Sequence, residues 1–425
     1  MMSKEARILN RMMKQTPFFG LLSKKGKEIY FPKMGFVQQS LDAKGKKINA
    51  TAGIANEDSG EIMSLPLMAQ RLNVNPGKSF SYSPSSGDPE LRQLWKESMI
   101  KKNPSIKTEI SNPIVTSGIT HGIWLAAYLF AEKGVDMIMP DLYWENYKLI
   151  FENGFGARIR TFPMFKDNKF NVEGLDNAIK ESQRPIVLLN FPNNPTGYTL
   201  TVEESAKVAD VIGENAKTKP LAVICDDAYF GLVYKEGIDK ESIFSRLIEK
   251  ENVLAIKCDG ATKENFAWGL RIGFITFGAR NGTKELYEAL EKKTIGAIRG
   301  SVSSSCTLSQ SLVADCLKDS GYQAQKQEKY EMLKQRFEEM EKIIKEEKYR
   351  KYLEPLPFNS GYFMCMDLKG IDAEKLRKRL LQRYDTGIIA IEGRIRIAYS
   401  AIPKARVREL FDNIFMACEG ISREK

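Results

Sequence analysis

This chain is best understood from two blocks that five residues separate, Gly260-Ala261-Thr262-Lys263 and Gly269-Leu270-Arg271-Ile272-Gly273. A lysine amine can form a Schiff base with an aldehyde, and an arginine can bind an anionic group on the same molecule. The fixed spacing of Lys263 and Arg271 therefore suggests the site of a covalently held cofactor. Because the chain contains 64 lysines and arginines, this interpretation depends on other residues lying in matching places.

The composition limits the classes of protein to consider. With 425 residues, 43% of them hydrophobic and 28% charged, the chain is typical of a globular protein large enough for two domains. No apolar run approaches the roughly 20 residues that span a bilayer, and the N-terminus lacks the apolar core of a secretory signal. We therefore expect a cytoplasmic protein without a membrane partner. The net charge of +10 is spread along the chain without a nucleic-acid-binding motif, so no nucleic-acid partner is expected.

Cysteine and histidine usage narrows the chemistry. The six cysteines are scattered without a C-x-x-C pair, which argues against a zinc site or a disulfide framework and fits a reducing compartment. His121 is the only histidine, so neither a histidine-based triad nor a multi-histidine metal site is expected. Acid and base chemistry would then depend on lysine, tyrosine or carboxylate side chains.

Short apolar runs alternate with longer amphipathic stretches through the middle of the chain. Strands are predicted over residues 113–116, 136–139, 185–190, 221–225, 253–257 and 271–277. Most of them precede segments of helical length, such as 119–133 and 202–214. This order is typical of an α/β domain with a largely parallel sheet.

The C-terminal third predicts a different arrangement. A long helix or a broken helical pair is expected over 315–350, strands over 362–367 and 388–399, and a last helix over 404–419. We therefore expect a large α/β domain at 60–315. A smaller α+β domain would combine 1–59 with 316–425.

Ligands bind beyond the carboxyl ends of the strands in sheets of this kind. Asp226 directly follows an apolar strand, and a buried carboxylate is costly unless it is paired. A protonated pyridine nitrogen is a suitable partner, with a turn or helix-cap role as the alternative. Asn194, in a segment rich in Asn, Pro and Gly, and Tyr229 could both donate to a phenolate oxygen.

Another strand end would supply an anion site. The run Ser117-Gly118-Ile119-Thr120 opens a predicted helix, where backbone N–H groups and the Thr120 hydroxyl can bind an anion. Arg271 would add a charge-assisted contact to the same group. Trp144, just past another strand, could stack on a flat ring, with ordinary packing as the alternative.

Together these residues resemble the fold-type I pyridoxal-phosphate enzymes, specifically the class I/II aminotransferases and their aspartate and aromatic branch. The resemblance implies a mostly parallel seven-stranded sheet with helices on both faces, and pyridoxal 5'-phosphate as the cofactor. It implies that Lys263 is the Schiff-base lysine, that Asp226 holds the ring nitrogen and that Arg271 binds the phosphate. The residues assigned to the cofactor are Ser117, Gly118, Ile119, Thr120, Trp144, Asn194, Asp226, Tyr229, Thr262, Lys263 and Arg271.

The same resemblance extends to the partner subunit and the substrate. Tyr82 is similar to the tyrosine that reaches the phosphate of the neighbouring subunit, which implies a homodimer with shared active sites. Gly53 is similar to the glycine that approaches the substrate carboxylate. Arg394 and Arg396 lie on the same face of one strand, so periodicity cannot separate them. Arg396 is preferred as the α-carboxylate ligand, because the following helix aligns better from it. Asn194 and Trp144 would also contact the substrate.

Two positions bear on substrate and phosphate binding. Arg299 lies where aspartate aminotransferases place an arginine that crosses the dimer to bind a side-chain carboxylate, so acidic as well as aromatic substrates are expected. Gly260 stands where the family usually has a serine. Phosphate binding should therefore depend more on Thr120, Arg271, Tyr82 and backbone amides.

The implied function is a ping-pong aminotransferase that moves an amino group between an amino acid and a 2-oxo acid. Lys263, Asp226 and Tyr229 would be its catalytic residues. A pyridoxal-phosphate-dependent β-lyase or decarboxylase would share every cofactor residue and is the nearest alternative. A non-catalytic regulator on the same fold would need an added DNA-binding domain, for which the 48 residues before Asn49 are too few.

Overall fold

The computed structural model describes residues 2–32, 35–72 and 76–424, and its largest sheet has seven strands. In spatial order these are β2 (Ile114–Thr116), β10 (Gly273–Gly278), β9 (Val253–Asp259), β8 (Leu221–Asp226), β7 (Pro185–Asn190), β3 (Asp136–Pro140) and β4 (Arg158–Phe162). The run from β9 to β4 is parallel, whereas β10 is antiparallel to both of its neighbours. The expected α/β class with a mostly parallel sheet is confirmed.

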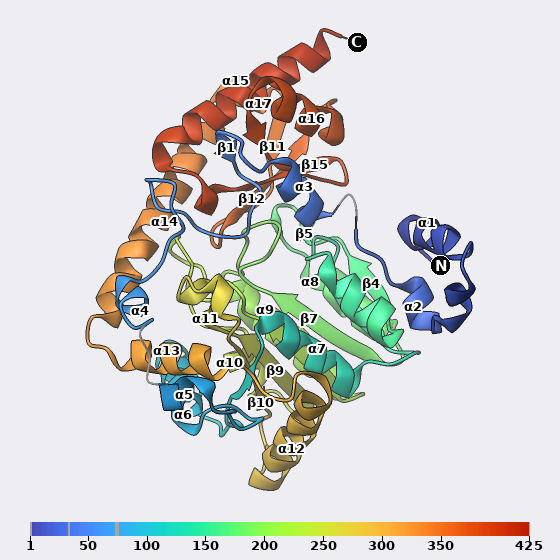
Figure 1. Ribbon diagram of the computed structural model, residues 1–425, viewed down its shortest axis with the longest axis vertical. Coiled ribbons are helices and arrows are strands. Elements are labelled where there is room, and N and C mark those ends of the chain that lie inside the picture. Colours follow the sequence, from blue (N-terminus) through green and yellow to red (C-terminus); the bar gives the residue numbers. More distant parts are fainter. Residues whose placement is uncertain (1, 33–34, 73–75, 425) are drawn as a thin grey trace.

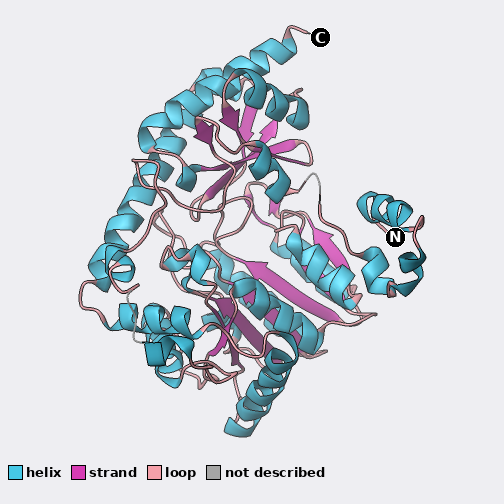
Figure 2. Ribbon diagram, in the orientation of Figure 1, coloured by secondary structure: helices cyan, strands magenta, loops and turns pink. Residues whose placement is uncertain are grey.

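Helices cover both faces of this sheet, which explains why its central strands are continuous apolar runs (Figures 1 and 2). α7 (Ile119–Phe130) packs on β8, β9 and β10, while α8 (Val172–Lys180) packs on β3 and β4, and α9 (Val202–Ala216) on β8 and β9. Every residue of β7 is buried. The sheet edge at which β7, β8 and β9 end therefore carries the polar residues that follow them.

The remaining helices of this region lie around the sheet. They are α4 (Pro66–Ala69), α5 (Pro76–Phe80), α6 (Pro89–Lys102), α10 (Phe244–Leu247), α11 (Ala261–Glu264), α12 (Lys284–Ser301) and α13 (Thr307–Lys318), with a π-helical segment, η2, at Lys148–Gly154 and a 3-10 turn, η3, at Trp268–Leu270. A small hairpin pairs β5 (Phe165–Lys166) with β6 (Lys169–Phe170).

A separate four-stranded antiparallel sheet lies in the C-terminal part of the chain (Figure 1). Its order is β11 (Leu353–Pro355), β12 (Phe363–Leu368), β15 (Arg394–Ala398) and β14 (Ile389–Ile391). Its helices are α14 (Tyr322–Ile344), α15 (Glu347–Arg350), α16 (Ala373–Arg383) and α17 (Val407–Ser422), with 3-10 turns η4 (Tyr399–Ala401) and η5 (Lys404–Arg406).

The N-terminal segment reaches both sheets. α2 (Lys24–Glu28) packs on η2, and α1 (Lys4–Met13) packs on α2 and on η1 (Pro17–Leu21). Figure 1 shows α1 and α2 at one side of the molecule. α3 (Phe36–Asp42) packs on β14, and β1 (Ile48–Asn49) pairs in parallel with β13 (Thr386–Gly387). Residues 36–49 thus join the C-terminal part, whereas α2 packs on η2, which belongs to the region of the large sheet. The division into 60–315 and into 1–59 with 316–425 stays a prediction.

Several predicted elements differ in their limits. The strand expected over 388–399 is a hairpin, because Glu392 and Gly393 turn the chain with φ of 39° and 83°. The helix expected over 315–350 is broken into the end of α13, then α14 and α15. Arg271 has left-handed backbone angles, φ 53° and ψ 50°, so β10 begins after it. The edge strand β4 was not predicted, because only its last residue is buried and it includes two arginines.

Within the described ranges, no helix combines the length and the apolar character needed to cross a membrane.

Candidate active site

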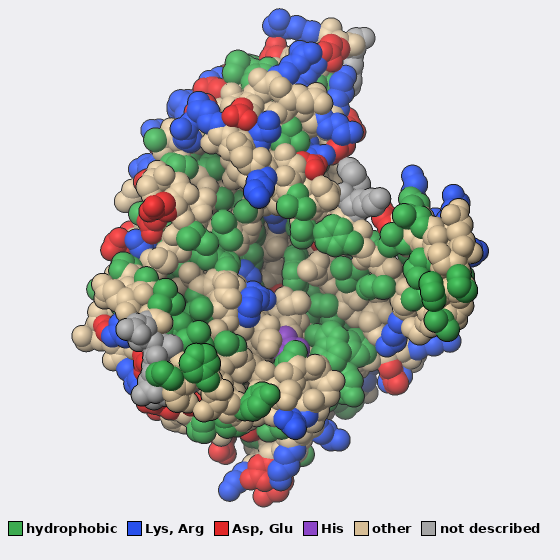
Figure 3. Space-filling model, in the orientation of Figure 1, with side chains coloured by type: hydrophobic (Ala, Val, Ile, Leu, Met, Phe, Trp, Pro, Cys, Tyr) green, Lys and Arg blue, Asp and Glu red, His purple; other side chains and the backbone are tan. Residues whose placement is uncertain are grey.

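A cavity of about 600 Å³ lies where the carboxyl ends of β7, β8 and β9 face β12 and β15. Figure 3 shows the molecule hollowed between its two sheets, with lysine or arginine side chains beside the hollow. Its walls come from α3 and the segment after it, the start of α7, the strand ends of the large sheet, and one side chain each from β12 and β15. The cavity therefore gathers segments that are far apart in the sequence.

Lys263 reaches this cavity from α11, the single helical turn that follows β9. Its Nζ lies 5.0 Å from the centroid of the Tyr229 ring. Burial lowers the pKa of Lys263 to about 8, with Arg271 acting in the same direction and Asp226 opposing both. A substantial fraction of the amine is therefore neutral near physiological pH, which is the form that attacks a carbonyl.

Asp226 ends β8 with its carboxylate buried beside the cavity. The Tyr147 hydroxyl donates to Oδ2, and the Ala228 N–H donates to Oδ1 at 3.1 Å. The Asn190 amide also donates to the Asp226 backbone carbonyl at 2.8 Å, so the residue is fixed from three sides. Burial nevertheless raises the pKa of Asp226 to about 6, because these contacts do not fully replace water.

Tyr147 and Asn190 were not predicted as site residues. Tyr147 lies three residues after Trp144, so the two rings pack edge to face with centroids 5.5 Å apart. Asn190 also accepts from the Asn194 backbone N–H at 2.9 Å and thereby shapes the loop after β7. The position of Asn190 at the end of an apolar strand is the signal that could have identified it.

The expected anion site combines the start of α7 with Arg271. Ile119 and Thr120 line the cavity with Arg271 and Thr262. Gly118 has φ 86° and lies so close to Arg271 that a Cβ would stand 2.5 Å from Nη2. Thr262 Oγ1 is buried and has no hydrogen-bond partner among the described residues. A helix N-terminus, a guanidinium and a free hydroxyl thus face the same end of the cavity.

Gly260 is explained by close backbone packing. A Cβ at this position would lie 2.6 Å from the Ile272 carbonyl oxygen and 2.7 Å from Gly273 Cα. β9 and the start of β10 therefore approach too closely for a serine side chain. This steric limit accounts for the glycine without any role in binding.

The middle of the cavity is suited to a flat ring. Trp144, Ala228, Tyr229 and Asn194 all line it. Asn194 Oδ1 accepts from Arg396 Nη1 at 2.8 Å, which leaves the amide nitrogen as the end that can donate toward the cavity. Burial raises the pKa of Tyr229, so its hydroxyl stays protonated and can donate as well.

The structure separates Arg396 from Arg394. Arg396 lines the cavity and is buried, and its guanidinium also donates to the Thr51 carbonyl oxygen at 2.8 Å. It lies between the rings of Phe36 and Phe363, 4.3 Å from each centroid. Arg394 instead pairs with Asp367 at 2.5 Å on the half-exposed part of β15.

The Arg396 guanidinium is only partly satisfied. Its Nε is buried and has no hydrogen-bond partner among the described residues. Burial lowers the pKa of Arg396 to about 10, which leaves it charged at neutral pH. Gly53, the glycine expected near the substrate, also lines the cavity, where a Cβ would approach the Tyr229 hydroxyl at 3.6 Å.

Five expected residues do not line this cavity: Arg394, Gly118, Ser117, Tyr82 and Arg299. Ser117 Oγ lies 3.4 Å from Ser305 Oγ and does not line the cavity. Tyr82 is 93% exposed. Arg299 is at the end of α12, where its guanidinium donates to Ser303 Oγ at 3.0 Å. The last two were expected to act in a neighbouring subunit, and their exposure is compatible with that expectation.

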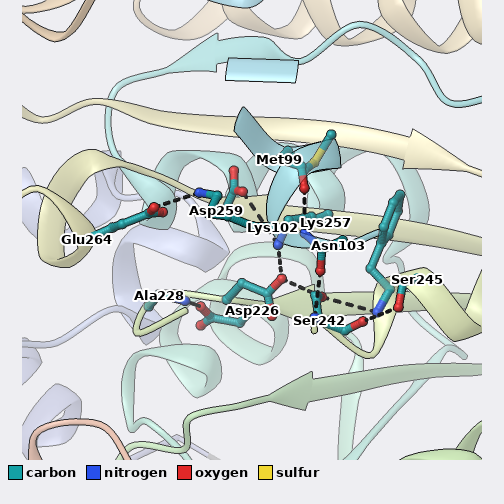
Figure 4. Close-up of polar contacts among 12 residues, drawn as sticks. Met99, Lys102, Asn103, Asp226, Ala228, Ser242, Ser245, Lys257, Asp259 and Glu264 are labelled. Atoms are coloured by element: carbon teal, nitrogen blue, oxygen red, sulfur yellow. Dashed lines mark hydrogen bonds and ion pairs between the residues drawn. The ribbon is translucent and has the colours of Figure 1, made fainter. Parts of the chain in front are cut away.

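A buried charge cluster backs the site on the other side of the strand ends (Figure 4). Lys257, with a fully buried side chain, pairs with Asp227 and lies 3.5 Å from Asp259. Asp227 also accepts from the Ser242 hydroxyl at 2.6 Å, and Asp259 from the Trp95 indole at 3.0 Å. These bonds tie the ends of β8 and β9 together directly behind Asp226.

Comparison with known proteins gives the family. The sequence model of the family described as "Aminotransferase class I and II" matches residues 46–414. An aspartate aminotransferase of Pyrococcus horikoshii is 26% identical over 356 residues, which cover 80% of this chain and 83% of that one. An aromatic-amino-acid aminotransferase 2 of Thermococcus litoralis is 26% identical over 46% of this chain and 48% of its own.

Solved structures agree in fold. An aminotransferase of Anaerococcus prevotii superposes with a TM-score of 0.81 at 24% identity, covering 93% of this chain and 98% of its own. An aspartate aminotransferase of Thermus thermophilus with maleate gives 0.77 at 19% identity, covering 93% of this chain and 99% of its own. Because the family match spans most of the sequence and includes every cavity segment from β1 to β15, the chain belongs to the class I and II aminotransferases.

Proposed function

We propose that this protein is a pyridoxal-phosphate-dependent aminotransferase whose cofactor is bound covalently to Lys263. The observation that carries the proposal is the convergence of Lys263, Asp226 and Arg271 on one cavity, at the carboxyl ends of β8 and β9 and just before the antiparallel β10. An amine with a lowered pKa, a buried carboxylate and a guanidinium are the groups that an aldehyde, a ring nitrogen and a phosphate require.

The residues fit this cofactor. The Thr262 hydroxyl is a buried polar group without a partner in the described part of the chain, and buried groups of this kind are normally satisfied. Asp226 is a buried carboxylate whose raised pKa shows that a positive partner would stabilise its charged form. Gly118 leaves no room for a side chain between α7 and Arg271. Thr120, Thr262, Arg271 and the backbone of α7 would hold the phosphate.

The chemistry that a bound pyridoxal phosphate would supply is an electron sink for the substrate Cα. Asp226 keeps the ring nitrogen protonated, and Tyr147 and Asn190 hold Asp226 in place. Asn194 and Tyr229 would donate to the ring hydroxyl, and Trp144 would cover one face of the ring. Lys263 Nζ would take the proton from the substrate Cα and return a proton as general acid.

Arg396 would bind the α-carboxylate of the substrate. Its free Nε and its position between two aromatic rings leave a charged edge for a carboxylate. An amino acid would leave as its 2-oxo acid, and a second 2-oxo acid would take up the amino group in the reverse half-reaction. The named relatives are aminotransferases, which favours amino transfer over the lyase or decarboxylase alternative.

Aromatic and acidic amino acids are the proposed substrates. Phe36, Val37 and Leu41 of α3 give the substrate side of the cavity an apolar wall, which suits an aromatic side chain. Lys44, exposed just after α3, lines the same side and could attract a distal carboxylate. The relatives carry aspartate and aromatic activities in their names.

The proposed assembly is a homodimer with shared sites. Tyr82 is 93% exposed and Phe80 nearby is 88% exposed, which suits aromatic side chains that a second subunit would cover. Tyr82 and Arg299 of one subunit would complete the phosphate and side-chain sites of the other.

Six unpaired cysteines are consistent with the cytoplasmic location proposed from the sequence.

An amino-transfer assay tests the proposal. Purified protein, supplied with pyridoxal phosphate, is incubated with single amino acids and 2-oxoglutarate, and glutamate and the new 2-oxo acid are measured. Equal amounts of the two products are expected for aromatic or acidic donors, and none with Lys263→Ala. Release of pyruvate and ammonia without a 2-oxo acid acceptor would instead establish the lyase alternative.

A further inference from the structure

Three consecutive residues, Lys263 to Asn265, each accept a hydrogen bond from the C-terminal third of the chain. The Tyr362 hydroxyl, just before β12, donates to the Lys263 carbonyl oxygen at 3.5 Å. Lys326 Nζ of α14 donates to Glu264 Oε1 at 2.7 Å, and the Tyr322 hydroxyl to Asn265 Oδ1 at 2.9 Å. The segment that carries the amine is therefore attached to elements outside the large sheet.

Glu264 is the centre of these contacts. Its carboxylate is only 5% exposed, and the oxygen that binds Lys326 also accepts from Lys102 of α6 at 2.6 Å (Figure 4). Burial alone would raise the pKa of Glu264, but the two ammonium groups outweigh it and hold the pKa at about 2. A buried carboxylate between two lysines is costly to desolvate and requires a defined geometry of all three groups.

α14 connects this carboxylate with the C-terminal sheet. The helix starts beside α13 and runs along one side of the molecule to α15 and α17 (Figure 1). Farther along it, Arg336 donates to the Ser400 carbonyl oxygen at 2.6 Å, within the turn that follows β15. Because a packed helix moves as a rigid element, its first turn and its contact with the turn after β15 are mechanically linked.

We infer that Glu264 and Lys326 are positioning residues. Their ion pair, together with Lys102, connects the segment of Lys263 to α14, so the position of the Lys263 amine depends on the position of the C-terminal sheet. The inference rests on the proposed function, in which Lys263 carries the cofactor. Arg396 belongs to the same C-terminal sheet. The pair thereby links the element that binds the substrate carboxylate with the one that carries the amine.

The test compares two lysines of α14 in the holoenzyme. Lys326→Met removes one partner of Glu264 but leaves Lys102 to neutralise it. Lys329→Met is the matched control: that side chain is 8% exposed and pairs with Glu57 at 3.0 Å and Glu328 at 2.9 Å, away from the 263–265 segment. Each variant removes one mostly buried ammonium group from the same helix.

Lys326→Met should lower kcat by about tenfold with KM changed less than about twofold, because a displaced amine slows the chemistry and not the binding. The pH midpoint of the cofactor absorbance should also move, since Lys263 shifts relative to Asp226 and Arg271. Lys329→Met should change neither quantity, even where both variants lose similar thermal stability. Lys326→Arg should recover most of kcat.

Equal kcat values and equal pH midpoints for Lys326→Met and Lys329→Met would overturn the inference. Should Lys326→Met fail to fold, Tyr322→Phe is the second variant. It removes only the hydroxyl that donates to Asn265 Oδ1, and it should also lower kcat. No change in kcat with that variant would likewise overturn it. Failure of the proposed function would be recognised by a different result, because the cofactor of the wild-type protein would then be found on another lysine.

Discussion

Lys263 combines chemical reactivity with burial, and its pKa gives a direct prediction at the scale of one residue. Only the neutral amine can capture an aldehyde, and burial lowers its pKa from 10.5 to about 8. The rate at which the apoenzyme binds pyridoxal phosphate covalently should rise with pH, with a midpoint near 8, and level off above it. Stopped-flow absorbance measures this rate.

The control for this measurement is Asp226→Asn. The Asp226 carboxylate raises the pKa of Lys263, so the variant should move the midpoint below that of the wild type. A midpoint near the ordinary lysine value in the wild type would contradict the described burial of the amine.

Asp226 should make the apoenzyme less stable at neutral pH. Its pKa is raised from 3.8 to about 6 in the folded state. A raised folded pKa means that stability is fully present below about pH 4 and is lost as pH rises through 6. The shift corresponds to about 3 kcal/mol at most, at about 1.4 kcal/mol per unit.

The Asp226→Asn apoenzyme should therefore unfold at a higher temperature than the wild-type apoenzyme at pH 8, with the difference vanishing near pH 4. Its amino-transfer rate should fall by about a hundredfold or more, the usual loss when a preorganised charge is removed. Calorimetry across this pH range checks the first expectation. An apoenzyme variant less stable than wild type at pH 8 would show that the carboxylate is well solvated.

At the scale of one element, β15 carries two arginines with different expected roles. Arg396→Ala should raise KM for the amino acid by about a hundredfold, since losing one partner of a buried charge pair costs about 3 kcal/mol. Arg394→Ala should change KM by less than about threefold, because Arg394 does not line the cavity and pairs with Asp367 in a half-exposed ion pair, which contributes little. Steady-state kinetics of both variants with amino acid and 2-oxoglutarate would decide, and equal effects would contradict the assignment.

The elements also show what the sequence could and could not predict. β7 to β9 were predictable because strands buried on both faces are continuous apolar runs. β4, at the sheet edge, has exposed and half-buried residues up to its last position, so periodicity could not distinguish it from a loop. The turn at Glu392 and Gly393 depends on positive φ values that a short apolar run does not indicate.

Among the site residues, those in fixed motifs such as Lys263 and Arg271 were predictable, whereas those set by tertiary packing were not. Phe36 meets Arg396 only because α3 packs on β14, across more than 300 residues of chain. Tyr147 likewise contacts Asp226 only through the folding of η2 against the sheet. Such contacts have no local sequence signal.

The whole molecule is proposed to be a dimer in which Tyr82 completes the site of the neighbouring subunit. Lys263→Ala and Tyr82→Ala variants should each have low activity, but mixed dimers should regain it, because one of their two sites contains both native residues. Mixing Lys263→Ala with Arg271→Ala is the matched control and should restore nothing, since these residues come from the same subunit. Recovery in both mixtures, or in neither, would contradict shared sites.

The central claim is that Lys263 holds the cofactor, and one measurement tests it most directly. The holoenzyme is reduced with borohydride, digested, and its peptides are mapped by mass spectrometry. The structure predicts a single phosphopyridoxyl adduct on Lys263, in the peptide that joins β9 to η3. An adduct on another lysine, or none in an active preparation, would contradict the account.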